Sequence, residues 1–264
     1  MLEYEYVNLK YKLQEVNMRI AVISDIHSNI YALDKVIEDI KNRNVDMIVC
    51  TGDLVGYGTR PNEVIHRIKE EKILTIMGNY DEAIGNFKII CGCDYPDPKD
   101  AEKASLSMNF TGQETTLENK AYLRNLPKEA VFTFSNKTIR FVHGSTRVIN
   151  EYLKENSKEA DEVMNELVED ILVCGHTHIP YTKYYGEKLL VNAGSVGKPK
   201  TNRPDANYVI IDIKNEDELV KTSSSVEVEI VEVAYDFEQI AKEIEDNEIL
   251  PNDFARLIRE GSSK

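Results

Sequence analysis

Cys174-Gly175-His176-Thr177-His178-Ile179-Pro180 directly follows the apolar run Ile171 to Val173. Such a run predicts a buried strand, and residues two apart on a strand point to the same side. His176 and His178 can therefore aim both imidazoles at one point beyond the end of that strand. Neutral imidazole is the commonest metal ligand in proteins. The pair alone predicts either a metal site or two surface histidines on a turn.

The remaining polar residues at strand ends favour the metal site. His27 and His143 each follow a predicted strand, and Asp25, Asp53 and Asn79 hold equivalent positions. Imidazole combined with carboxylate suits manganese, iron, zinc or nickel. Seven oxygen and nitrogen ligands are about right for two divalent ions that share a bridging carboxylate. The predicted metal ligands are Asp25, His27, Asp53, Asn79, His143, His176 and His178.

The order of the elements predicts an α/β fold. Predicted strands 19–24, 46–50 and 73–77 alternate with helices 30–40 and 61–70, and each strand delivers polar residues at its carboxyl end. The second half is rich in strands, and the chain ends in an amphipathic helical tail. No repeat or linker divides the chain, which predicts one domain over 18–264 with an N-terminal extension, 1–17, a cap-like helical insertion at about 88–128 and the tail at 236–262.

Composition narrows the classes of function. The 264 residues carry a net charge of -14 and hold no run of 18 apolar residues. We therefore expect neither a nucleic-acid polymer nor a membrane as partner, but a small anionic substrate that bound cations attract. The absence of a secretion signal and the small number of cysteines predict a cytoplasmic protein. Cys91 and Cys93 lack the second pair that a structural zinc site requires.

The ligand motifs occur in a recognisable order. Asp25-x-His27, Gly52-Asp53-x-x-Gly56, Gly78-Asn79-x-Asp81, His143-Gly144 and Gly175-His176-x-His178 together resemble the calcineurin-like metallophosphoesterase superfamily. The resemblance runs from Met18 to about Ile213. The segment Asn192 to Pro199 is similar to its small prokaryotic phosphodiesterase branch, the YfcE-like proteins. This resemblance implies a two-sheet β-sandwich flanked by helices, a four-layer αββα fold, with a dimetal site at one edge.

The resemblance also implies a role for each ligand. One ion would be held by Asp25, His27 and His178. The other would be held by Asn79, His143 and His176, and Asp53 would bridge the two ions. Such a pair clamps a phosphate and lowers the pKa of a shared water, which then attacks phosphorus. Asp53, Asn79 and His143 are the expected catalytic residues of a dimetal phosphoesterase, in first place a phosphodiesterase for a small diester or nucleotide.

Two departures from the family pattern concern the substrate. Many members have Gly-Asn-His-Asp where this chain has Gly78-Asn79-Tyr80-Asp81. A phenol, with a pKa of about 10, is a weaker acid than imidazolium, so we expect substrates that carry good leaving groups. Tyr80 would instead stack on a base or aryl group of the substrate. The second motif also lacks the arginine that binds phosphate in protein phosphatases. Arg147 and Asn29 are the candidate replacements, with Lys198 and Arg203 as weaker ones.

Other functions remain open at this point. Within enzymes, the alternatives are a dinucleoside polyphosphate hydrolase and a phosphomonoesterase. Outside enzymes, the alternative is a non-catalytic scaffold or regulator with the same fold, although a full ligand set argues for catalysis. The sequence does not decide the physiological substrate, the native metal or whether the chain forms a homo-oligomer.

Overall fold

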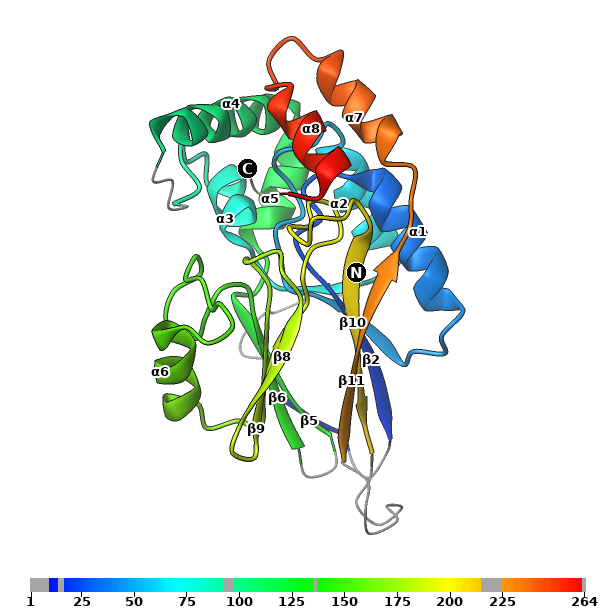
Figure 1. The fold of residues 1–264 in the computed structure, drawn as a ribbon, viewed down its shortest axis with the longest axis vertical. Coiled ribbons are helices and arrows are strands. Elements are labelled where there is room, and N and C mark those ends of the chain that lie inside the picture. The colour runs from blue at the N-terminus through cyan, green and yellow to red at the C-terminus, as the bar shows by residue number, and fades with distance from the viewer. Residues whose placement is uncertain (1–9, 14–16, 93–96, 135–136, 215–224, 263–264) are drawn as a thin grey trace.

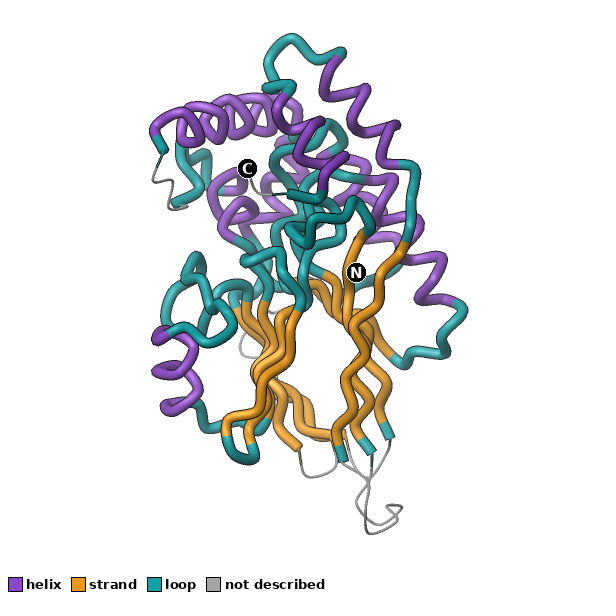
Figure 2. Tube along the Cα trace, in the orientation of Figure 1, coloured by secondary structure: helices purple, strands orange, loops and turns teal. Residues whose placement is uncertain are grey.

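The computed structural model describes residues 10–13, 17–92, 97–134, 137–214 and 225–262. Two mixed sheets lie face to face as the inner layers of a sandwich (Figure 1). A six-stranded sheet has the order β1-β5-β6-β7-β9-β8, and a five-stranded sheet has the order β11-β10-β2-β3-β4. Helices cover the outer faces (Figure 2). The predicted αββα sandwich is therefore confirmed.

The five-stranded sheet is built on three parallel strands. These are β2 (Met18–Ile23), β3 (Met47–Cys50) and β4 (Leu74–Thr75), with α1 (Ile30–Lys41) and α2 (Pro61–Glu70) as the crossovers. β10 (Ala206–Ile213) runs antiparallel to β2, and β11 (Val226–Val233) runs antiparallel to β10. The parallel pairing brings the carboxyl ends of β2, β3 and β4 to one edge, where the candidate ligands lie.

The six-stranded sheet brings the remaining ligands to the same edge. Its strands β6 (Lys137–Val142), β7 (Ile171–Cys174) and β9 (Lys188–Asn192) are parallel. β5 (Glu129–Phe134) runs antiparallel to β6, and β8 (Tyr181–Tyr185) runs antiparallel to β9. β1 (Lys10–Leu13) pairs in parallel with β5. Part of the predicted N-terminal extension is thus an edge strand of this sheet.

Apolar side chains explain the layering. Between the sheets, residues such as Ile20 and Val209 from one sheet meet Phe141 and Val173 from the other. The outer face of the five-stranded sheet packs against α1 and α2 and against two tail helices, α7 (Phe237–Glu245) and α8 (Asp253–Glu260). α6 (Lys158–Glu166) covers the six-stranded sheet through Ala160 and Val163.

The insertion contains two helices, and a third helix that the sequence did not predict precedes it. α4 (Pro98–Glu114) and α5 (Leu117–Arg124) lie where helices were expected. α3 (Asn79–Gly85) was expected to be a loop, and the predicted strand 73–77 shrinks to Leu74–Thr75. The Asp81 carboxylate accepts the N–H of Gly78, which caps the first turn of α3. In the described part of the chain, no helix has the length and apolar character needed to span a membrane.

Candidate metal centre

Loops from both sheets converge at the carboxyl edge of the sandwich (Figure 1). β2 leads into the loop with Asp25 and His27, and β3 leads into the loop with Asp53. Asn79 begins α3, His143 follows β6, and the histidine pair follows β7. All seven predicted ligands are buried, with at most 5% of any residue exposed. The structure therefore brings together every residue that was predicted to bind metal.

The first group of ligand atoms consists of Asp25, His27 and His178. The Nε2 atoms of His27 and His178 are 3.2 Å apart. Asp25 Oδ1 lies 3.7 Å from Nε2 of His27 and 3.2 Å from Nε2 of His178. Four-coordinate bonds of about 2.1 Å place neighbouring ligand atoms about 3.4 Å apart. The spacing in this group therefore fits a single ion.

The second group consists of Asp53, His143 and His176, with Asn79 beside it. His143 Nε2 lies 3.0 Å from Asn79 Oδ1 and 3.5 Å from Asp53 Oδ2. The same Asp53 oxygen is 3.8 Å from Nε2 of His27, which belongs to the first group. Its other oxygen, Oδ1, accepts the N–H of Tyr80 at 2.8 Å. One carboxylate oxygen of Asp53 thus lies between the two groups, and together the groups form a candidate dinuclear centre.

Hydrogen bonds to the backbone fix which ring nitrogen faces the centre. Nδ1 of His27, His143 and His178 lies 3.1, 2.8 and 2.6 Å from the carbonyl oxygens of Val55, Thr51 and Lys198. A carbonyl can only accept, so in a neutral ring Nδ1 carries the proton and Nε2 presents a lone pair. Two such lone pairs face each other across 3.2 Å in the first group, an arrangement that a cation between them stabilises.

Two polar atoms of the ligand groups have no hydrogen-bond partner in the part of the chain that the structure describes. Among the described residues, Oδ1 of Asp25 and Nε2 of His176 are buried and accept no hydrogen bond. Burial would lower the pKa of His143, yet the carboxylates of Asp53 and Asp25 raise it to about 9. The two carboxylates therefore stabilise a positive charge beside His143, whereas burial lowers the pKa of His176 to about 3 and keeps that imidazole neutral, as a metal ligand must be. The donor set of imidazoles, carboxylates and an amide fits divalent ions.

The ligand loops are held in a backbone conformation that most residues avoid. Asp25, His27, Asp53, His176 and His178 all have φ between 48° and 64°. A left-handed conformation in a non-glycine residue costs about 1–3 kcal/mol and persists only where the surroundings enforce it. Here the surroundings include Gly175, because a Cβ at that position would collide with Ser24 and with the Asp25 carboxylate. Strain concentrated on five ligands is typical of a functional site.

The family model for the calcineurin-like phosphoesterase superfamily domain matches residues 18–216 of this chain. The chain belongs to the calcineurin-like phosphoesterase superfamily. It is accordingly a hydrolase that acts on phosphoester bonds. The matched range includes all seven candidate ligands and ends before the tail helices α7 and α8.

Two curated relatives are similar over most of their length. An uncharacterised protein of Methanocaldococcus jannaschii is 33% identical over 251 residues, which cover 89% of this chain and 95% of the relative. Phosphodiesterase YfcE of Escherichia coli is 25% identical over 205 residues, which cover 74% of this chain and 88% of YfcE. The resemblance to the YfcE-like proteins is thus supported by sequence.

Solved structures of low sequence identity have the same fold. A hypothetical protein of Pyrococcus horikoshii OT3 superposes with a TM-score of 0.76 at 22% identity, covering 94% of this chain and 100% of that chain. A metallophosphoesterase of Sphaerobacter thermophilus superposes with a TM-score of 0.71 at 24% identity, covering 92% and 99%. Both superpositions extend beyond residues 18–216, since each covers more than nine-tenths of this phosphoesterase.

Two residues expected to contact substrate, Asn29 and Arg147, have protein partners for their side chains. The side chain of Asn29 caps α1 through Ala32 and donates to Gly197 O and to Tyr235 Oη, both at 3.0 Å. It is 1% exposed, so its amide supports the fold instead of facing a ligand. Arg147 donates to Glu151 at 2.6 Å and to Glu162 at 3.0 Å, so two carboxylates hold its guanidinium.

Tyr80 is buried as well. Only 1% of it is exposed, and its ring lies so close to Gly56 that a Cβ there would collide with it. The ring packs edge-on against His27, with 5.4 Å between ring centroids. Tyr80 is therefore close to the first ligand group, but its face is closed to a base or aryl group.

Two tyrosines that the sequence analysis did not single out lie against the histidines. The Tyr57 ring is 4.8 Å from that of His27, and the Tyr152 ring is 4.1 Å from that of His176. Both are half-buried. The position of Tyr57 within Gly56-Tyr57-Gly58, directly after a ligand motif, was the available signal. Tyr152 follows the His143 motif by nine positions, and no pattern marks it.

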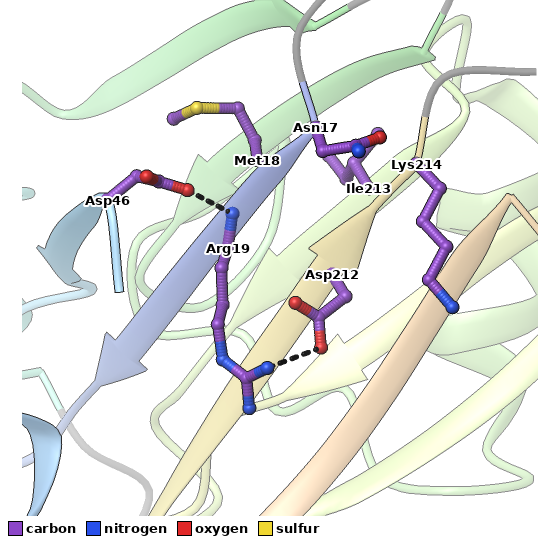
Figure 3. A pocket seen from close by; sticks show the side chains of 7 residues that line it. All are labelled: Asn17, Met18, Arg19, Asp46, Asp212, Ile213 and Lys214. Atoms are coloured by element: carbon purple, nitrogen blue, oxygen red, sulfur yellow. Dashed lines mark hydrogen bonds and ion pairs between the residues drawn. The ribbon is translucent and has the colours of Figure 1, made fainter. Parts of the chain in front are cut away.

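The cysteines and a cavity at the opposite end of the molecule lie outside the ligand groups. Cys50 and Cys174 are buried free thiols, Cys91 is also buried, and Cys93 lies outside the described residues. A cavity of about 220 Å³ lies at the opposite end of the strands (Figure 3). There Arg19 pairs with Asp212 at 3.5 Å and donates its backbone N–H to Asp46 at 2.7 Å. Arg19 and Asp212 thus form an ion pair at the wall of this cavity.

Proposed function

We propose that this phosphoesterase is a dimetal phosphodiesterase that hydrolyses a small phosphodiester or nucleotide. The observation that carries the proposal is the position of Asp53 Oδ2, at 3.8 Å from Nε2 of His27 and 3.5 Å from Nε2 of His143. Asp25, His27 and His178 would hold one ion, Asn79, His143 and His176 the other, and Asp53 both. The donor set supports manganese, iron, nickel or zinc.

Two bound ions would neutralise phosphate charge and supply a nucleophile from water at neutral pH. The protein's own part in the reaction is to fix geometry. Backbone carbonyls orient three imidazoles, and the N–H of Tyr80 holds the outer oxygen of Asp53. Asn79 is oriented in turn, because its Nδ2 donates to Cys91 O at 3.2 Å and leaves Oδ1 facing His143.

The buried Tyr80 supports the preference for diesters with good leaving groups. A side chain with 1% exposure cannot deliver a proton to a leaving group in the solvent-facing part of the site. An unactivated alkyl monoester needs that proton more than an aryl diester does, because an alkoxide is a poor leaving group. Homology to phosphodiesterase YfcE agrees with this assignment.

The proposal also covers the domain organisation and the location of the protein. We infer that residues 18–264 form a single domain, because α7 and α8 share one apolar cluster with α1 and the five-stranded sheet. We also infer a cytoplasmic location, supported by the buried free thiols of Cys50 and Cys174, which a reducing compartment preserves.

The test is hydrolysis of bis-p-nitrophenyl phosphate and p-nitrophenyl phosphate by protein reconstituted with manganese, nickel, zinc or magnesium. We expect metal-dependent cleavage that favours the diester and is lost in Asp53→Asn. Equal rates in the wild type and in Asp53→Asn would refute the proposed centre. Faster cleavage of the monoester would refute the diester preference and favour a phosphomonoesterase.

A further inference from the structure

Tyr57 occupies a built position beside the first ligand group. Its φ is 58°, and its backbone N–H donates to Ser107 Oγ of α4 at 2.8 Å. The ring meets His27 edge-on, with an interplanar angle of 87°. The loop after β3 thus carries a half-buried aromatic ring to the His27 side of the centre.

Lys198 is fixed to the same ligand group through its backbone. Its carbonyl oxygen accepts Nδ1 of His178, and its N–H donates to Ser195 Oγ at 2.8 Å. Ser195 Oγ in turn donates to the carbonyl oxygen of Asp25 at 2.7 Å. Two of the three ligands in the group are therefore tied to the chain segment that carries Lys198.

The side chain of Lys198 lies over the ring of Tyr57. Its Nζ lies 4.7 Å from the centroid of the Tyr57 ring, while the residue is only 7% exposed. Lysine is among the residues least often buried, since removing an ammonium from water costs free energy. An aromatic face offsets part of that cost and fixes where the ammonium lies.

We propose that Lys198 and Tyr57 form an anion subsite next to the Asp25, His27 and His178 group, where the ammonium binds an anionic oxygen on phosphorus. The proposal rests on the proposed phosphodiesterase function. A lysine ammonium binds phosphate as a compact point charge. In a chain with a net charge of -14, such a local cation helps to bring an anionic substrate to the centre.

The C-terminal tail supports this subsite. Phe254 of α8 packs edge-on against Tyr57, with 5.1 Å between ring centroids, and is 3% exposed. α8 lies outside the residues that the family model matches. Phe254 is therefore a positioning residue, since it holds Tyr57 between the tail and His27.

The anionic oxygen can belong to the reacting phosphate or to a second phosphate of the substrate. Calorimetric titration of manganese-loaded protein with inorganic phosphate and with pyrophosphate separates these sources. For Lys198→Met we expect about 10- to 100-fold weaker binding, the effect of losing one charge-assisted contact. Weaker binding of both anions assigns Lys198 to the reacting phosphate. Weaker binding of pyrophosphate alone assigns it to a second phosphate.

Two further variants isolate the charge. Lys198→Arg keeps the cation and should bind within about threefold of wild type. Lys183→Met is the matched control, because Lys183 also lies over a tyrosine ring, at 4.4 Å from that of Tyr185, but on β8. Metal content measured by elemental analysis must be equal in all variants.

The subsite is overturned if Lys198→Met binds both anions as tightly as wild type, or if the loaded wild type binds neither. These titrations need no turnover. A wild type that binds phosphate through Lys198 but cleaves no diester would therefore refute the proposed function and leave the anion subsite standing.

Discussion

Asp81→Asn probes how the protein holds its bridging ligand. The Asp81 carboxylate is fully buried and accepts three backbone N–H groups. Its Oδ2 accepts from Asp53 at 2.9 Å and from Gly78 at 3.0 Å, and its Oδ1 accepts from Leu54 at 2.9 Å. Asp81 therefore fastens the Asp53 loop to the first turn of α3. We expect the amide to weaken both the fold and metal binding.

The size of the effect follows from these three bonds. In its better orientation the amide keeps two of them and turns its NH2 toward Leu54, whose N–H loses its acceptor at a cost of about 1–3 kcal/mol. The two surviving bonds lose charge assistance, about 1 kcal/mol each. Burial and the charge of Asp53 raise the pKa of Asp81 to about 7. The carboxylate thus carries a cost that the amide avoids, which offsets much of this loss, and we expect a net loss of about 1 kcal/mol.

Two assays measure the outcome. Thermal unfolding should show Tm lowered by roughly 2–4 °C, and metal titration should show about 10- to 100-fold weaker binding, as for other residues that orient metal ligands. Asp97→Asn is the control. Its carboxylate accepts the N–H of Lys99 at 2.9 Å at the exposed start of α4, and asparagine caps helices equally well. Unchanged metal affinity in Asp81→Asn would refute a role in holding the ligand.

Three further changes test other parts of the structure. Gly175→Ala should lower the metal content from two ions to one by elemental analysis, because its Cβ would collide with Asp25; two retained ions would contradict this. Chelation should lower Tm, since each ion at a hundred times its Kd contributes about 2.7 kcal/mol; calorimetry with equal Tm values for both forms would count against bound metal. Glu243 accepts from Thr59 at 2.5 Å and from Arg60 at 2.9 Å, and although burial raises its pKa, these partners lower it below 4.5 overall. The stability that Glu243→Gln removes is therefore present above pH 4.5 and disappears as pH falls through the lower folded pKa. Urea unfolding of the wild type and the variant should therefore show a smaller difference in stability at pH 4 than at pH 7.

The α/β class and the convergence of the ligand residues could be predicted because both depend on local pattern, whereas the two-sheet sandwich was expected from the family resemblance. Each ligand residue follows an apolar run or a glycine, and parallel strands bring such positions to one edge. His176 and His178 illustrate this, since the two-residue spacing after β7 was enough to place them together. α3 was not predicted because its seven residues depend on a cap that Asp81 supplies only when Gly78 and the Asp53 loop are in place.

The surroundings of the ligands could not be predicted because they depend on distant partners. Asn29 was expected to contact the substrate, but its amide donates hydrogen bonds to Gly197 and Tyr235, which lie far along the chain. Arg147 was expected there too, but local acidic partners hold it. Tyr57 is placed by Phe254 of the tail, a contact across about two hundred positions that no local spacing encodes.

The most direct test of the central claim is electron paramagnetic resonance of the manganese-loaded protein at two ions per chain. If Asp53 bridges the two ligand groups, the wild type gives the spectrum of a spin-coupled manganese pair, and Asp53→Asn gives the six-line signal of isolated ions. An isolated six-line signal in the wild type, with two ions bound, would contradict a shared bridging carboxylate and with it the dinuclear centre.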